Sequence, residues 1–206
     1  MGVAELDSHV RSLIVADASA DSVFACIDNA LVAPHEGSLA GLLNMYERQR
    51  AVVESSTRVR CFFPGPGGGS TYAAALYIVD ALMKDERASV IAIATSERVA
   101  ERLDEAVERM SPPHLGNFNR VLVCESIVAA LYDDYLPSTG KPAPYTHAVI
   151  DFGTSPPDFH DQEWYLCAFD ALCHRLVRRE GSILFTGSPP KAARDAIARL
   201  NEATRS

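Results

Sequence analysis

The stretch from Pro64 to Thr71 reads PGPGGGST and decides the fold of this chain. An apolar run, 59–63, leads into it, and a helical pattern, 71–83, leads out of it. A strand that enters a glycine-rich loop and opens a helix presents backbone N–H groups and the positive end of the helix dipole to an anion. The stretch predicts a phosphate-binding loop, although three consecutive glycines also suit a plain tight turn.

The rest of the chain alternates apolar, strand-like runs with amphipathic helical patterns. The strand-like runs are 59–63, 89–94, 121–124, 148–152 and 182–186, and the helical patterns are 38–55, 71–83, 96–110, 127–131, 162–179 and 190–204. Alternation of this kind predicts a three-layer α/β sandwich, with a mostly parallel sheet of roughly five or more strands and helices on both faces. We expect one domain over residues 1–206, with 1–37 as an N-terminal lead-in.

Polar residues follow several of these runs. The glycine-rich loop, Thr95-Ser96, Asp151 and Thr186-Gly187-Ser188 each lie at the carboxyl end of a predicted strand. Ligands of parallel sheets bind at the carboxyl ends of the strands, so these residues are expected to converge on one edge.

Composition narrows the function classes. Apolar residues make up 48% of the 206 residues, which is a normal globular value and argues against wholesale disorder. The net charge of −8 does not support a broad nucleic-acid-binding face. No apolar run approaches the length of a membrane span, and the five cysteines form no C-x-x-C pair. We interpret these thiols as reduced and the protein as intracellular, without a membrane partner.

The order of these segments resembles the ATPase core shared by viral DNA-packaging terminases and helicase-type P-loop motors, over residues 42–190. The segment YERQR, residues 46–50, is similar to the glutamine motif that reads adenine, and AVID, residues 148–151, to the strand whose aspartate orders Mg²⁺ through water. SILFTGSPP, residues 182–190, is similar to the motif that senses the terminal phosphate. The resemblance implies a RecA-like P-loop NTPase fold that binds ATP and Mg²⁺.

Site residues follow from the same resemblance. It places Mg²⁺ at Thr71 and Asp151, and gives Asp151 the catalytic role. The implied cofactor-binding residues are Gln49, Gly65, Gly67, Gly68, Gly69, Ser70, Thr71 and Ser188.

Two catalytic groups depart from the family pattern. The phosphate loop G-x-x-x-x-G-K-[ST] would place its lysine at Ser70, which carries no positive charge for the β- and γ-phosphates. Phe152 follows Asp151 where the family has the glutamate that activates water. One member of a cluster just after Asp151 could replace that glutamate, namely Asp158, His160, Asp161 or Glu163, but Asp161 or a neighbour equally suits the cap of the following helix.

We therefore expect a P-loop NTPase-like domain with degenerate motifs, serving as a weakly binding, non-hydrolysing or structural subunit. Its partners would be other protein subunits of an assembly that handles viral DNA. An active ATPase with a non-standard loop is an alternative, as is an interaction module without a ligand. A PP-loop hydrolase and a dinucleotide-binding fold are further alternatives, and the loop matches each of them poorly.

Overall fold

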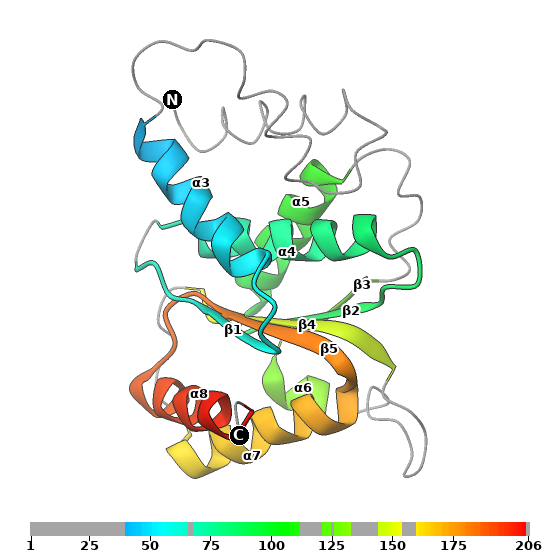
Figure 1. The fold of residues 1–206 in the computed structure, drawn as a ribbon. Helices are drawn as coiled ribbons and strands as arrows, with labels where there is room; N and C mark the ends of the chain where they lie inside the picture. Colours follow the sequence, from blue (N-terminus) through cyan, green and yellow to red (C-terminus); the bar gives the residue numbers. More distant parts are fainter. Residues whose placement is uncertain are drawn as a thin grey trace.

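The computed structural model describes residues 40–65, 68–111, 121–124, 126–132, 144–153 and 160–204 (Figure 1). The expected lead-in 1–37, Gly67 and Asp158 lie outside these ranges. The described residues include Cys61, Cys167 and Cys173 as free thiols, of which Cys173 is buried and Cys167 is exposed.

Five parallel strands form one sheet in the order β1-β5-β4-β2-β3. The strands are β1 (Val59–Phe62), β2 (Val90–Ala94), β3 (Val121–Cys124), β4 (Tyr145–Asp151) and β5 (Val177–Thr186). Most are continuous apolar runs because helices cover both faces of a parallel sheet.

Helices cover the two faces in separate groups. On one face lie α3 (Ala40–Val53), α4 (Ser70–Lys84) and α5 (Glu97–Met110), and on the other lie α6 (Ile127–Tyr132), α7 (Gln162–Ala171) and α8 (Lys191–Ala203) (Figure 1). The three-layer α/β sandwich expected from the sequence is confirmed. Ser96 caps α5 as expected, because its side chain accepts a hydrogen bond from the Val99 N–H.

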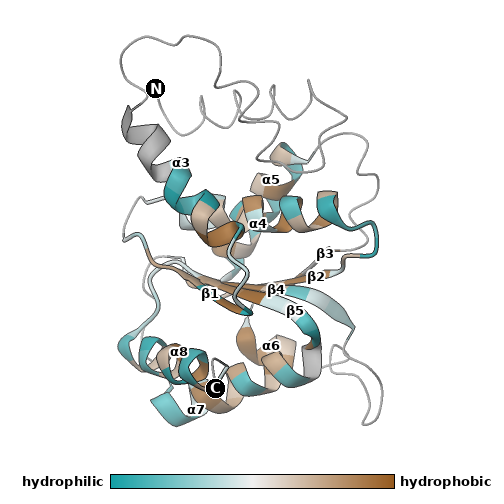
Figure 2. Cartoon of the chain, viewed as in Figure 1, coloured by the Kyte–Doolittle hydropathy of each residue, from teal (hydrophilic) through white to brown (hydrophobic). Residues whose placement is uncertain are grey.

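Alternating strand residues divide the core into two halves. Val149 and Leu184 pack with α4 on one face, whereas Ile150 and Phe185 pack with α7 and α8 on the other. The hydropathy colouring shows the sheet and the inner sides of the helices as the apolar part of the molecule (Figure 2). This period of two also fixes the direction in which each polar strand residue points.

The expected helix over 162–179 is wrong in its last part. α7 ends at Ala171, a single π-helical segment (Leu172–Leu176) follows, and β5 begins at Val177. Val177 pairs with Tyr145, and Ser182 pairs with His147, so the intervening residues bulge out of the sheet. The Arg58 guanidinium donates to the backbone carbonyls of this bulge, which stabilises an extended path that the local sequence does not reveal.

Candidate phosphate-binding site

Two polar residues at strand ends face the start of α4. Asp151 shares its face of β4 with Val149, and Thr186 shares its face of β5 with Leu184, so both point toward the α4 layer. The register places Asp151 directly beside Thr186, and Thr186 beside Phe62 at the end of β1. Parallel pairing therefore collects the glycine-rich loop, Thr186 and Asp151 at one edge of the sheet.

Glycines shape the loop between β1 and α4. Gly65 has a φ of 83° and Gly69 a φ of 74°, both in the left-handed region that favours glycine. Gly69 is the N-cap of α4 and offers no side chain, so the first turn of the helix has no side-chain cap. The backbone groups at the helix start are thereby left available to an anion.

The Thr71 hydroxyl links the end of the loop to β4. The Thr71 hydroxyl donates to Oδ2 of Asp151 at 2.8 Å, and the Gly153 N–H donates to Oδ1 at 2.9 Å. The Asp151 side chain is completely buried. Burial raises the pKa of this carboxyl, and the two hydrogen bonds oppose the rise. A buried acid with a raised pKa at the end of a strand is a candidate functional position.

β5 contributes a contact that the sequence motifs did not single out. The Thr186 hydroxyl donates to the Ser70 carbonyl at 3.2 Å, and Thr186 is fully buried. Gly187 follows with a φ of 95°, and a Cβ there would lie 2.9 Å from Oδ1 of Asp151. Both residues lie at the end of an apolar run and within the segment 182–190, but the resemblance assigned a site role there to Ser188 alone.

Gln49 lies beside the loop, but inside the protein. Its side chain is 1% exposed, and Nε2 donates to the Gly69 carbonyl at 3.2 Å. Among the described residues, its Oε1 has no hydrogen-bond partner. Gln49 is thus brought to the glycine-rich loop from α3.

Ser188 joins the same edge through its backbone. Its N–H donates to the Gly153 carbonyl at 3.0 Å, which ties the segment after β5 to the segment after β4. Phe152, at the position of the family glutamate, is buried and packs edge-on against Phe169 on the opposite face of the sheet. The structure therefore gathers the described site residues, while Phe152 points away from them.

Nearby cations are engaged elsewhere. Arg58 donates to carbonyls of the β5 bulge and to Cys173, whereas Arg60 donates to the carbonyls of Val53 and Thr57. Lys191 forms an ion pair with Asp195 on α8. None of these contacts involves the loop.

The acidic cluster after β4 is accounted for in part. Asp161 is the N-cap of α7, and its carboxylate accepts from the Trp164 N–H at 2.8 Å. His160 stacks on the Trp164 ring with 3.7 Å between centroids. The described part of this cluster therefore starts a helix, as the capping interpretation predicts.

The oxygen atoms at the loop suit a Mg²⁺ ion that is also bound by phosphate and water. They do not suit a metal ion held by protein groups alone. Mg²⁺ binds through one or two protein oxygens and completes its octahedron with water and phosphate. The Thr71 hydroxyl and the Asp151 carboxylate supply such a pair. The described residues contain no group of three or more His, Cys, Asp or Glu side chains that could hold a metal by themselves.

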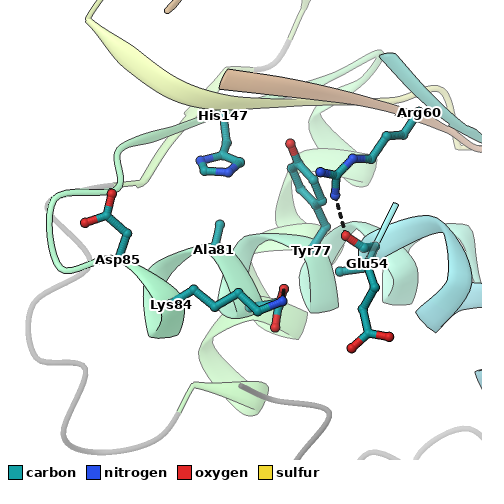
Figure 3. Close-up of a pocket in the computed structure, with 9 residues that line it drawn as sticks. Glu54, Arg60, Tyr77, Ala81, Lys84, Asp85 and His147 are labelled. Carbon is teal, nitrogen blue, oxygen red and sulfur yellow. Dashed lines mark hydrogen bonds and ion pairs between the residues drawn. The ribbon is translucent and has the colours of Figure 1, made fainter. Parts of the chain in front are cut away.

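A separate cavity of about 150 Å³ lies at the other end of α4, near the amino ends of the strands (Figure 3). Arg60, Lys84 and His147 line it together with Tyr77, whose hydroxyl bonds to Ser182. Lys84 pairs with Asp80 at 2.7 Å. On α4, the cavity is lined by Tyr77, Asp80, Ala81 and Lys84, whereas the loop adjoins Ser70 at the helix start, so the two are distinct places in the fold.

His147 is held as a neutral acceptor in this cavity. The Thr146 hydroxyl donates to the Ser89 carbonyl, so it must accept from Nδ1–H of His147 at 2.8 Å. Burial lowers the pKa of His147 to about 4, and the charge of Arg60 adds to this effect. Nε2 is therefore the unprotonated nitrogen at neutral pH.

No protein-family model matches the chain, and no curated protein is significantly similar to it. Over the residues that the structure describes, no helix is long and apolar enough to cross a bilayer.

Proposed function

We propose that this chain is a nucleotide-binding domain of the P-loop type that binds a Mg²⁺-bound triphosphate weakly and hydrolyses it slowly or not at all. The hydrogen bond from Thr71 to Asp151 carries the proposal. It joins the end of the glycine-rich loop to the end of a buried strand 80 residues away. These are the two oxygen groups that a P-loop domain uses toward Mg²⁺.

The position of the loop in the sheet supports this proposal. The helix after β1 lies on one face of the sheet, and the helix after its neighbour β5 lies on the other (Figure 1). Helices that diverge in this way open a crevice at the carboxyl ends of the two strands, where ligands of open α/β sheets bind. The loop and Thr186 both lie at the carboxyl ends of these two strands.

The same site lacks the groups that accelerate hydrolysis. Ser70 occupies the first position of α4 and cannot neutralise charge on the transferring phosphate. Phe152 offers no base for an attacking water. When bound, Mg²⁺ would supply charge neutralisation, while Thr71 and Asp151 would position it and the loop N–H groups would hold the phosphates.

A domain that folds but hydrolyses nucleotide slowly or not at all suits the role of a subunit. We propose that the domain works beside other protein subunits in an assembly that handles DNA, as its resemblance to terminase and helicase cores suggests. The acidic net charge of −8 favours a protein partner over direct contact with DNA.

Calorimetric titration with ATP and Mg²⁺, with hydrolysis followed in the same sample, tests the proposal. We expect Mg²⁺-dependent binding with a Kd of the order of 0.1–1 mM and negligible turnover. Absence of binding at millimolar ATP would leave an interaction module as the better function. Rapid turnover would establish an active ATPase instead.

The variant Asp151→Asn distinguishes an effect on ligand binding from an effect on folding stability. The amide can still accept from the Gly153 N–H and can donate to the Thr71 hydroxyl, so both contacts survive. Because burial raises the pKa of Asp151, the neutral side chain removes a folding cost at neutral pH. We expect an unchanged or higher free energy of unfolding together with loss of Mg²⁺-dependent binding.

Gly69→Val tests the loop itself. Valine is strained at the positive φ of Gly69, and its branched side chain would crowd the helix start. Loss of ATP binding in a variant that still unfolds cooperatively supports the site. Full retention of binding would place the nucleotide elsewhere.

A further inference from the structure

We infer that Gln49 and Thr186 are positioning residues of the phosphate loop, and that the site recognises the triphosphate chain whatever base it carries. This inference rests on the proposed function and names its substrate class. It departs from the resemblance, in which the glutamine reads adenine.

The burial of Gln49 argues against base reading. Its side chain is 1% exposed, and its amide group faces the Gly69 carbonyl. Only the NH₂ end can face a carbonyl oxygen at 3.2 Å, so the orientation of the amide is determined. One of the two N–H donors of the amide is therefore used inside the protein, and burial keeps the other from a base.

The bond from Gln49 fixes the first peptide group of α4. The Gly69 carbonyl accepts from Nε2 of Gln49 at 3.2 Å and from the Ala73 N–H at 2.9 Å, so both of its lone pairs are used. In a planar trans peptide, the N–H of the next residue points opposite to the carbonyl. Holding the Gly69 carbonyl toward the helix therefore aims the Ser70 N–H out of the helix start.

Thr186 does the same for the next peptide group. Its hydroxyl donates to the Ser70 carbonyl at 3.2 Å from a fully buried position on β5. The Thr71 N–H is then directed by the same planar geometry. Two consecutive N–H groups are thus oriented by side chains from two other elements, which is the preorganisation that an anion site requires.

The second polar atom of the Gln49 amide is closed to a ligand as well. Oε1 is buried beside the helix start and has no partner among the described residues. Leaving a buried acceptor unpaired is unfavourable. The same burial closes Oε1 to the water shell of a ligand, so Gln49 acts on the site through its bond to the Gly69 carbonyl.

The test compares three ligands in the presence of Mg²⁺: ATP, GTP and inorganic tripolyphosphate. We expect the unchanged chain to bind all three with Kd values within about threefold of one another. Gln49→Met, which keeps the size of the side chain but removes the donor, should weaken all three by the same factor, about fivefold for one neutral hydrogen bond.

Different failures are distinguishable. If ATP binds and tripolyphosphate does not, or if Gln49→Met weakens ATP alone, Gln49 reads the base and the inference is wrong while the proposed function stands. If none of the three ligands binds the unchanged chain, the proposed function fails as well.

Two further variants separate positioning from a loss of stability. Tyr77→Phe removes a buried hydrogen bond from the middle of α4, away from the loop, and should lower stability without changing the affinity for tripolyphosphate. Gln49→Glu can donate to the Gly69 carbonyl only when protonated. The affinity of this variant for tripolyphosphate, divided by that of the unchanged chain at the same pH, should therefore rise as the pH is lowered from 8 to 5. A ratio that does not change with pH would contradict the positioning role.

Discussion

Ser70→Lys is the most direct test of the proposed phosphate-binding role of the glycine-rich loop. Ser70 is half-buried at the first position of α4, where its side chain has a route to the ligand and to solvent. A lysine there would restore the positive charge that this loop lacks. The change should act oppositely on the free and the ligand-bound protein.

The magnitude follows from charges at the helix start. In the free protein, a cation at a helix N-terminus is unfavourable by about 0.3–1 kcal/mol, so the free energy of unfolding should fall by that amount. With triphosphate bound, two unit charges about 4 Å apart attract by about 4 kcal/mol at an effective dielectric constant near 20. Ordering the lysine side chain costs about 2 kcal/mol. The net gain of about 2 kcal/mol corresponds to roughly thirtyfold tighter binding.

Calorimetric titration with Mg²⁺-ATP measures the affinity, and urea denaturation without ligand measures the stability. Ser70→Met controls for side-chain length, and Ala198→Lys adds the same charge at an exposed position of α8. Neither control should bind ATP more tightly than the unchanged chain. An unchanged affinity in Ser70→Lys would refute the alignment of this loop with a P-loop.

Three other predictions concern the fold around the site. His147 has a pKa of about 4 in the folded protein against an ordinary 6.5, so the unfolded chain takes up the proton first as the pH falls. Urea denaturation should therefore show the free energy of unfolding falling by about 2–3 kcal/mol from pH 6.5 to pH 4, and the loss should be smaller in His147→Asn. Tyr77→Phe leaves polar atoms of Ser182 without their partner and should lower the free energy of unfolding by about 1–3 kcal/mol. Burial also raises the pKa of Tyr77 to about 12, so the unchanged chain should lose stability as the pH rises from 10 to 12. Gly187→Ala strains a positive φ and presses a methyl group toward Asp151, so thermal unfolding should reveal a loss of at least about 2 kcal/mol, and unchanged stability would contradict the close packing at this edge.

The strands were predictable because burial on both faces leaves an unbroken apolar run in the sequence. The end of α7 was not, because the polar segment at 178–180 suits a helix surface as well as an exposed strand end. Pairing of Val177 with Tyr145, and the Arg58 contacts with the bulge, select the extended path. Both partners are distant in the sequence.

Some residues of the candidate site could be identified from the sequence, and others only from the structure. Asp151 and the loop could be named from their places after apolar runs, and their role toward a nucleotide stays a prediction. Thr186 could not be distinguished from Ser188, because only the register of β5 against β4 shows which hydroxyl faces α4.

By itself, the sequence determined a parallel α/β sandwich with a glycine-rich loop at the carboxyl edge of its strands, because periodicity and glycine content are local properties of the chain. Only the tertiary structure decided that β5 lies between β1 and β4, that Thr71 meets Asp151, and that Gln49 supports the loop from inside. Those outcomes depend on strand order, register and burial, which arise when segments far apart in the chain compete to pack against one another.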